Sequence, residues 1–562
     1  MTTTEKIWLA AYPPGTPAEI ELDERTTLVT IFEESCRRYA DRPAYHNLGV
    51  ILTFSDLDRL SRQFAAHLQA AGLRPGDRIA LMMPNVLQYP VALFGALRAG
   101  LIVVNTNPLY TARELRHQLR DSGARAIVIL ENFAHVLQEA LAETEVSHVI
   151  VTGVGDLAPF PKRAVINFVV RRVRRMVRPY QIPGAVRFRD ALARGANASF
   201  EAPPIRQDDI AFLQYTGGTT GTAKGTVLTH RNLVANLQQV AAFWKDVIQP
   251  GQDVVITALP LYHVFCLTCN CLVFTQHGGL NVLITNPRDI AGFVRELRKW
   301  RFTIMTGVNT LFNALLEHPD FRRIDFSSLK LAVAGGMALQ PAVAERWRAV
   351  TGKPMVEGYG LTEASPVVAC NPREATRLGS IGVPLPSTDV MFLHDGRMER
   401  LPGITGELCV RGPQVMRGYW NKPEETQEKL LPDGWLRTGD VATMDEDGYL
   451  RIVDRVDDVI NVSGFNVYPN EVESVLAEHP AVLEAGCIGV PDEHSGQAVK
   501  AVVVTREGMS VSAEELREFC RQRLTRYKVP RYVEFRPSLP KTNVGKVLRR
   551  ALAEPQAAGR GT

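Results

Sequence analysis

Residues 215–230 read YTGGTTGTAKGTVLTH, with four glycines, six threonines and a single lysine. Glycine lets backbone N–H groups turn toward an anion and approach it closely, because it has no Cβ. The threonine hydroxyls add further donors, and Lys224 adds a mobile positive charge. The stretch therefore predicts a loop that binds a phosphate group.

This loop differs from the Walker-type phosphate loop. That motif places Ser or Thr directly after a G-x-x-x-x-G-K run and continues into a helix. Here Gly225 follows Lys224, and Val227 and Leu228 are typical of a strand. The next helix is expected to begin later, with Thr229 as its N-cap. A hairpin rich in glycine and threonine, without a ligand, is the simpler alternative as long as the loop is considered alone.

The length and composition predict a large globular protein. The chain has 562 residues, of which 45% are hydrophobic, enough for several separate cores. Its first residues, MTTTEKIWLAAYPPG, lack the basic and apolar segments of a secretory signal. The most apolar stretch, residues 261–274 (LYHVFCLTCNCLVF), is shorter than the roughly 20 residues needed to cross a bilayer. We therefore expect a cytoplasmic protein.

Charge is distributed unevenly along the chain. A formal net charge of +4 gives no reason to expect a nucleic-acid partner. Residues 162–178, KRAVINFVVRRVRRMVR, contain seven basic residues and no acidic one, with apolar residues at helical spacing. The pattern predicts an amphipathic helix with a cationic face. Such a helix either makes peripheral contact with anionic lipid at the inner face of the membrane or packs on its own domain and faces solvent.

The order of apolar segments predicts an α/β protein. Strand-like runs such as RIALMM, RAIVIL and VVITAL alternate with amphipathic helices, which favours largely parallel sheets. After about residue 385 the strands become shorter and richer in turns, as in TGELCVRG. Beyond Arg455, strands alternate with charged helices. We therefore expect a separate α+β domain, with its boundary near residues 454–458.

Three further motifs accompany the phosphate loop. The glycine pair of AGGMAL, which begins at residue 334, would let a flat base lie against the backbone. In EGYGLTEASP, Tyr359 has a ring that can stack on adenine, Thr362 has a hydroxyl that can donate to a phosphate, and Glu363 has a carboxylate that can coordinate Mg²⁺. In RTGD, Asp440 is expected in a turn, where its carboxylate can accept hydrogen bonds from both hydroxyls of a ribose. Together these motifs indicate a nucleotide site.

In this order the motifs resemble those of the acyl-adenylate-forming ligases, a superfamily of acyl-CoA synthetases, nonribosomal peptide adenylation domains and beetle luciferases. Within that group the chain is most similar to bacterial long-chain fatty acyl-CoA synthetases. The resemblance covers nearly the whole chain. It rests on FLQYTGGTTGTAKG, ALPLYHVF, RLGSIGVPLPSTD, GWLRTGDVATMDEDGYLRIVDR, VSGFNVYPNEVE and LPKTNVGKVLRR.

The resemblance implies a fold and a reaction. The fold is α/β, with a large N-terminal domain (residues 1–456) of two β/α subdomains and a β-rich subdomain, and a small, mobile α+β C-terminal domain (residues 457–562). In the reaction, ATP and Mg²⁺ convert a fatty carboxylate into acyl-AMP with release of pyrophosphate, and the thiol of CoA then displaces AMP. The expected partners are therefore small molecules, and whether the chain forms a homodimer is left open.

The resemblance also implies, position by position, which residues bind ATP. Thr362 would contact the α-phosphate, Glu363 would hold Mg²⁺, and His263 would lie beside the reacting carboxylate and the entrance for CoA. A histidine buried in the core is the alternative for His263. The remaining positions are Tyr215, Thr216, Gly217, Gly218, Thr219, Thr220, Gly221, Lys224 and Gly225 for the phosphates, Gly336, Gly358 and Tyr359 for adenine, and Asp440 and Arg455 for ribose.

The resemblance also implies that the C-terminal motifs take part in the change from the first half-reaction to the second. By resemblance, Lys546 would bridge the fatty carboxylate and the α-phosphate, and the C-terminal domain would turn about a hinge at Asp457. Gly464 would line the channel for the thiol arm of CoA. The chain departs from the long-chain pattern at Val456 and Asp457, where those enzymes commonly have two lysines.

Two alternatives stay open at this point. An enzyme with the same mechanism could act on a medium-chain or aryl carboxylic acid instead. A scaffold that binds lipid or nucleotide without catalysis is the other alternative. The sequence retains Lys224, Glu363, Asp440, Arg455 and Lys546, and their joint presence argues against a site that has decayed.

Overall fold

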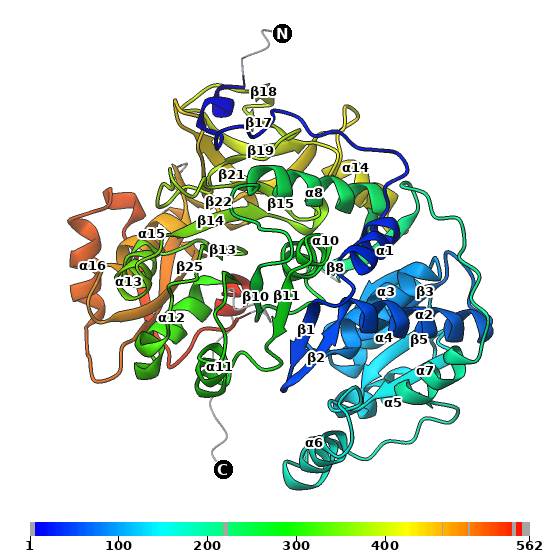
Figure 1. Cartoon of the computed structure of the whole chain (residues 1–562). Helices are drawn as coiled ribbons and strands as arrows, with labels where there is room; N and C mark the ends of the chain where they lie inside the picture. Colours follow the sequence, from blue (N-terminus) through cyan, green and yellow to red (C-terminus); the bar gives the residue numbers. More distant parts are fainter. Residues whose placement is uncertain (1–5, 217–222, 464, 493–494, 542–546, 554–562) are drawn as a thin grey trace.

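The computed structural model describes residues 6–216, 223–463, 465–492, 495–541 and 547–553 (Figure 1). Within these ranges no helix is both long enough and apolar enough to cross a membrane. Some residues with predicted roles lie outside the described ranges: Gly217, Gly218, Thr219, Thr220, Gly221, Gly464 and Lys546.

The first sheet combines segments that are far apart in the sequence. Its order over the described residues is β16 (Val383–Pro384), β15 (Val367–Cys370), β14 (Met355–Gly360), β13 (Leu331–Ala334), β12 (Ile304–Gly307), β10 (Val254–Thr257), β11 (Leu280–Leu283), β1 (Pro43–Asn47) and β2 (Val50–Thr53). The strands from β14 to β1 are parallel, whereas β15, β16 and β2 pair antiparallel. The carboxyl ends of β13 and β14 carry the predicted adenine motifs.

The second sheet carries the phosphate-loop hairpin. In the described part of the chain its order is β20 (Gly418–Tyr419), β9 (Lys224–Thr229), β8 (Ile210–Thr216), β4 (Ile102–Asn105), β3 (Arg78–Met82), β5 (Ala124–Leu130), β6 (His148–Thr152) and β7 (Val186–Arg187). β8 and β9 are antiparallel and join at the loop, with Thr216 opposite Lys224. The strands from β8 to β7 are parallel. The expectation of largely parallel sheets is therefore confirmed for both β/α subdomains.

Two smaller sheets complete the fold. The β-rich part is antiparallel, in the order β18 (Arg397–Glu399), β17 (Asp389–His394), β19 (Thr405–Arg411), β21 (Leu436–Met444) and β22 (Leu450–Arg455). The C-terminal sheet contains β24 (Phe465–Val467), β23 (Ile460–Val462), β26 (Gly496–Thr505), β25 (Val482–Asp492) and β27 (Tyr532–Phe535), with α15 (Pro469–Ala477) and α16 (Ala513–Arg521). These parts confirm the predicted fold class. The boundary at residues 456 and 457 stays a prediction, and it lies between the end of β22 and the start of β23.

The helices of the large domain pack on the parallel sheets, and several begin at reciprocal capping boxes. Thr229 caps α8, as expected, because its hydroxyl accepts from the N–H of Asn232 and its own N–H donates to the Asn232 side chain. The described helices of this domain are α1 (Leu28–Arg38), α2 (Phe54–Ala70), α3 (Gln88–Arg98), α4 (Ala112–Ser122), α5 (Ala134–Ala140), α6 (Lys162–Phe168), α7 (Phe188–Ala196), α8 (His230–Phe243), α9 (Val264–Cys266), α10 (Val273–Gln276), α11 (Ile290–Leu297), α12 (Asn309–Glu317), α13 (Pro341–Thr351) and α14 (Pro423–Lys429).

Two local expectations were wrong. Asp440 does not lie in a turn but within β21, where Gly439 has a φ of +76° and the pairing with β19 shifts register. The register shift changes the direction in which this part of the strand points its side chains. The carboxylate of Asp440 therefore points in a direction that regular strand pairing would not allow. The basic segment is also less regular than predicted. α6 passes into a π-helical turn at Val169–Val173, and residues 174–185 contain no helix.

Candidate active site

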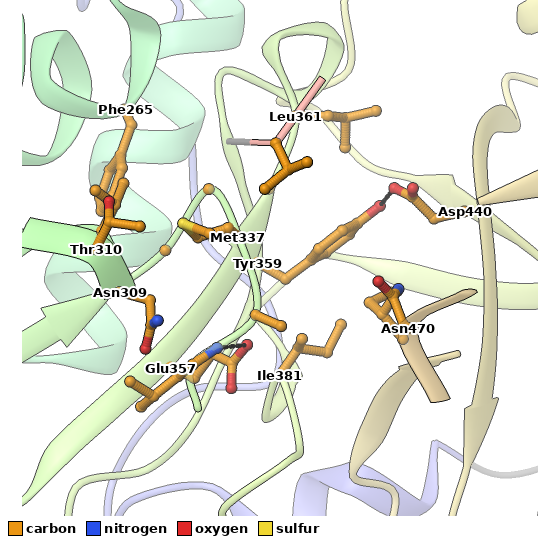
Figure 2. A pocket seen from close by; sticks show the side chains of 18 of the residues that line it. Phe265, Asn309, Thr310, Met337, Glu357, Tyr359, Leu361, Ile381, Asp440 and Asn470 are labelled. Atoms are coloured by element: carbon orange, nitrogen blue, oxygen red, sulfur yellow. Dashed lines mark hydrogen bonds between the residues drawn. The ribbon is translucent and has the colours of Figure 1, made fainter. Parts of the chain in front are cut away.

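A single cavity of about 2520 Å³ connects the large domain with the C-terminal domain. Its lining includes the ends of β13 and β14, the β8–β9 hairpin, and residues of β21 and β22. The C-terminal domain contributes α15 and residues 547–550. Figure 2 shows part of this cavity, with Tyr359 extending from β14 toward Asp440. The sequence motifs that are far apart in the chain therefore meet around one space.

The predicted adenine positions lie where β13 and β14 end. Gly336 has a φ of +75°, a backbone conformation that glycine adopts without strain. A Cβ on the preceding Gly335 would stand 3.0 Å from the ring of Phe265 and 3.2 Å from the carbonyl oxygen of Gly358. The glycines at this point therefore keep a narrow slot open beside Tyr359, which fits a planar base.

The predicted ribose positions form a buried polar pair. The hydroxyl of Tyr359 donates to Asp440 at 2.5 Å, and Arg455 Nε lies 3.6 Å from the other carboxylate oxygen. Burial, together with the charge of Asp440, raises the pKa of Tyr359 well above its usual value. Among the described residues, the buried Nε of Arg455 has no hydrogen-bond partner. A buried carboxylate beside an N–H that makes no hydrogen bond fits a ligand with vicinal hydroxyls, such as a ribose.

Glu363 lies in a short 3₁₀ turn, Thr362–Ala364, directly after β14. Its carboxylate accepts from the hydroxyl of Tyr419 at 2.7 Å, and its carbonyl accepts from the N–H of Met416 at 2.7 Å. The Nζ of Lys224 lies 5.5 Å from the centre of the Tyr419 ring. Tyr419 thus stands between the predicted metal ligand and the predicted phosphate-binding lysine, and Thr362 lines the cavity beside them.

The stem of the phosphate loop is tightly packed. The hydroxyl of Tyr215 donates to Asp121 in α4 at 2.5 Å, and the carbonyl of Gly225 accepts from the N–H of Trp420 at 2.8 Å. A Cβ at Gly225 would stand 3.1 Å from the Tyr215 ring. The two residues are paired across the hairpin. Tyr215 and Gly225 therefore fix the base of the loop.

His263 lies at the start of α9 and lines the cavity. Its Nδ1 accepts from the N–H of Phe265 at 3.3 Å. Burial lowers the pKa of His263 to about 4, because the charged imidazolium would be poorly solvated there. At neutral pH this side chain is therefore uncharged, and it can donate or accept a hydrogen bond but cannot provide a positive charge.

The structure adds Glu357, which the sequence analysis did not select. This residue of β14 is 7% exposed, and its carboxylate accepts from the N–H of Leu339 at 3.1 Å. Burial raises the pKa of Glu357 to about 8. Figure 2 shows it on the cavity wall near Asn309. Its position directly before the GYG run was the signal available in the sequence.

Comparison with known proteins identifies the family. A family model described as AMP-binding enzyme matches residues 32–420, and the model of the AMP-binding enzyme C-terminal domain matches residues 471–546. The chain belongs to the AMP-binding enzymes.

Full-length relatives and a solved structure resemble this AMP-binding enzyme closely. It is 57% identical to a long-chain-fatty-acid–CoA ligase of Yersinia pestis, over 98% of both chains. It is 56% identical to the ligase of the same name from Salmonella typhimurium, again over 98% of both. The crystal structure of the anthranilate CoA ligase AuaEII in complex with anthranoyl-AMP superposes with a TM-score of 0.83 and 26% identity. That match covers 94% of this chain and 97% of the other.

An apolar branch of the cavity extends beside α8 and α10 in this AMP-binding enzyme. Phe265 stands near the slot for the base, since a Cβ on Gly335 would lie 3.0 Å from its ring. The remaining apolar lining comes from α8 and the residues after it, from the segment after β10 and from α10, and these side chains are buried. They include Val240, Trp244, Ile248, Leu259, Val273 and Phe274. Such a lining excludes water and suits a hydrocarbon chain.

The side chains of this AMP-binding enzyme can hold Mg²⁺ only if phosphate oxygens of the substrate supply further ligands. Among the described residues, no group of three or more His, Cys, Asp or Glu side chains is arranged to hold a metal ion. Mg²⁺ commonly binds through one or two carboxylates, waters and substrate phosphate oxygens. Glu363 is a carboxylate that contacts Tyr419 beside Lys224, and it therefore fits that role.

Proposed function

We propose that this AMP-binding enzyme activates long-chain fatty acids to acyl-CoA, through an acyl-AMP intermediate and with release of AMP and pyrophosphate. The observation that carries the proposal is the continuity of one cavity, from the polar pair of Tyr359 and Asp440 to the apolar branch at Trp244. The relatives with 56% and 57% identity bear the name of this activity, which supports the choice of substrate. ATP, Mg²⁺ and CoA are the small molecules required.

The first half-reaction joins a carboxylate oxygen to the α-phosphorus and breaks the bond to pyrophosphate. Mg²⁺, when bound, neutralises charge on the phosphate oxygens. Lys224 and the loop at residues 216–225 would stabilise the β- and γ-phosphates, and Thr362 would donate to the α-phosphate. In the second half-reaction the sulfur of CoA attacks the acyl carbon and AMP leaves. The reacting groups come from the substrates, so the protein needs no nucleophile of its own.

The hinge residue Asp457 and two residues outside the described ranges, Lys546 and Gly464, receive roles in the same scheme. Lys546 would place its positive charge between the carboxylate and the α-phosphate in the first half-reaction. The C-terminal domain would then turn about Asp457, and Gly464 would line the path of the CoA thiol. Asp457 lies in the short 3₁₀ turn η7 (Val456–Asp458), between β22 and the C-terminal sheet, which is a suitable place for a hinge.

A ligase for medium-chain or aryl carboxylic acids is the second candidate. The likeness to the anthranilate CoA ligase favours it, since that protein shares the fold over most of the chain. An aryl substrate would occupy only the mouth of the apolar branch. A long acyl chain would gain about 0.8 kcal/mol for each methylene group that it buries there.

The test is a product analysis with ATP, Mg²⁺, CoA and a series of acids from two to eighteen carbons, together with benzoate and anthranilate. AMP and acyl-CoA should appear in equal amounts, and kcat/KM should rise about fourfold for each added methylene until the branch is filled. A maximum with an aryl acid would establish the second candidate instead. Absence of AMP with every acid would refute the enzymatic proposal.

We also propose that the protein works in the cytoplasm, at the inner face of the membrane. The segment 160–178 exposes apolar side chains beside its arginines, with Phe160 75% and Phe168 60% exposed. Lys162 donates to the carbonyl of Gly49 at 2.9 Å, which joins the segment to the β1–β2 hairpin. That hairpin exposes two more apolar side chains, Leu48 and Ile51. Apolar side chains flanked by cations fit an anionic bilayer.

Sedimentation with vesicles tests this location. The wild-type protein should bind phosphatidylglycerol vesicles at low salt, bind less as salt increases, and bind phosphatidylcholine vesicles weakly. Replacing Arg172 and Arg175 by Glu should abolish the binding. The control is Arg521→Glu on α16, which changes the net charge far from the segment. Equal binding by all variants would contradict the assignment.

A further inference from the structure

A carboxylate behind the nucleotide cavity contacts the irregular part of β21. Glu407 of β19 is buried, with its side chain only 8% exposed. One of its carboxylate oxygens accepts from the backbone N–H of Gly439 at 3.1 Å. The other accepts from Arg437, from Nε at 2.9 Å and from Nη2 at 2.6 Å. Glu407 therefore contacts β21 directly before Asp440.

The pairing of β19 with β21 is interrupted at this point by a bulge. Residues 438–440 of β21 stand opposite the single residue Leu408 of β19. Such a bulge breaks the ladder of backbone hydrogen bonds, and the N–H groups that it releases need other acceptors. Gly439 has a φ of +76°, in the left-handed region that glycine adopts without strain. On the other side of β21, Asp440 remains paired with Arg455 of β22.

Two side chains replace the backbone acceptors that the bulge loses. Glu407 accepts from the N–H of Gly439, and the hydroxyl of Thr438 accepts from the N–H of Asp440 at 3.1 Å. The same hydroxyl donates to the carbonyl of Leu408 at 2.7 Å. A buried N–H without an acceptor is unfavourable. The shape of the bulge therefore depends on the side chains of Glu407 and Thr438.

The bulge determines where the carboxylate of Asp440 lies. That carboxylate accepts from the hydroxyl of Tyr359 at 2.5 Å, a hydrogen bond that Figure 2 shows, and it lies 3.6 Å from Nε of Arg455. A Cβ on Gly439 would stand 3.2 Å from Nη2 of Arg455. Asp440 directly follows the residue whose N–H donates to Glu407. Loss of that hydrogen bond would therefore move the carboxylate that faces Tyr359 and Arg455.

We propose that Glu407 is a positioning residue for the ribose of ATP: it holds the bulge of β21 so that the carboxylate of Asp440 meets both ribose hydroxyls. Arg437, Thr438 and Asp440 belong to the described lining of the cavity, whereas Glu407 does not. Glu407 therefore acts through β21 and makes no contact of its own with the nucleotide. The inference rests on the proposed function, in which Asp440 binds the ribose.

The experiment measures how strongly the full-length protein prefers ATP over 2′-deoxy-ATP and 3′-deoxy-ATP. Formation of AMP or deoxy-AMP with palmitate and CoA gives kcat/KM for each nucleotide. The wild type should prefer ATP at least about tenfold over each analogue, because each missing hydroxyl removes a hydrogen bond to a charged group. In Glu407→Ala the preference should fall below about threefold, because the carboxylate of Asp440 no longer meets the ribose.

Further variants separate positioning from general support of the sheet. Asp440→Ala should lose the preference, and the double variant with Glu407→Ala should lose no more than Asp440→Ala alone. Glu407→Gln keeps the shape and one acceptor oxygen, so its preference should lie between those of the wild type and Glu407→Ala. Asp389→Ala removes another carboxylate of the same sheet, paired with Arg411 at 3.0 Å, and should leave the preference unchanged.

Melting temperatures of all variants show which of them fold. If Glu407→Ala does not fold, Glu407→Gln carries the test, with a preference at least about threefold below that of the wild type.

Several results would overturn the proposal. An unchanged preference in Glu407→Ala, with all three nucleotides used equally less well, would show that Glu407 only supports the sheet. A further loss in the double variant would show that Glu407 acts apart from Asp440. A wild type that uses both deoxy-ATP analogues as well as ATP would remove the ribose from Asp440, and the inference with it. A wild type that forms no AMP with any acid would instead refute the proposed function.

Discussion

Glu357→Gln should make the protein more stable, and increasingly so as the pH rises. Glu357 is 7% exposed and faces the cavity from β14. Its carboxylate accepts from the N–H of Leu339, and the amide oxygen of glutamine can accept the same bond. The substitution thus preserves shape and hydrogen bonding. It removes a carboxyl group that keeps its proton in the folded protein but ionises in the unfolded chain.

The size of the effect follows from proton linkage. In the unfolded chain the carboxyl of Glu357 loses its proton near pH 4.5, whereas in the folded protein its pKa is about 8. Unfolding therefore releases a proton between these values, and the free energy of unfolding falls as the pH rises through them. Each pH unit contributes about 1.4 kcal/mol, so the advantage of the glutamine variant approaches about 5 kcal/mol at pH 8 and stops growing above it.

The assay is urea unfolding of the wild type and the variant at pH 6, 7 and 8. The difference in free energy of unfolding should grow by about 2.5 kcal/mol over this range. Glu345→Gln on α13 is the matched control, because that glutamate is exposed in the same part of the molecule, and its difference should not change with pH. A constant difference between wild type and Glu357→Gln would refute the argument that Glu357 is buried with its proton.

Three further predictions address the catalytic cycle. Lys546→Ala should lower acyl-AMP formation at least about 10²-fold while supplied acyl-AMP is still converted to acyl-CoA, and equal losses would contradict its assigned role. Asp457→Pro should block the second half-reaction, because proline fixes φ near −65° and a hinge must change it; full conversion of acyl-AMP by this variant would remove the hinge from Asp457. Val273→Trp should fill the apolar branch, so the preferred acid in a chain-length series should become shorter, whereas an unchanged preference would show that the acyl chain lies elsewhere.

The sequence predicted the architecture well because the strands of parallel sheets are apolar runs that are visible without knowledge of their partners. The motifs that follow strands, such as Gly336 after β13 and Glu363 after β14, indicated residues that line one cavity, and the roles of these residues stay predictions. The register shift that places Asp440 within a strand could not be predicted, since it depends on the pairing of β21 with β19. The helix expected at 162–178 ends early, because helical spacing alone does not determine where a chain leaves a helix.

Glu357 and Arg549 show a different limit of sequence analysis. Only the place of Glu357 before the GYG run distinguishes it in the sequence, and nothing distinguishes Arg549; burial and the contacts of each side chain appear only in the folded chain. Arg549 meets Asp454, which lies 95 positions earlier. No spacing rule connects such residues, so only the folded structure brings out their contacts.

The pairing of β1 with β11 has a consequence for synthesis on the ribosome. Tyr45 lies opposite Asn281, so the N-terminal hairpin is made 236 residues before its neighbour in the sheet. At about 5 to 20 residues per second, the hairpin waits about 10 to 50 s for that neighbour. During this interval the unpaired backbone N–H and C=O groups along the edge of β1 are available to other nascent chains. The order of translation therefore exposes this protein to aggregation early, and slower elongation before β11 would lengthen that exposure.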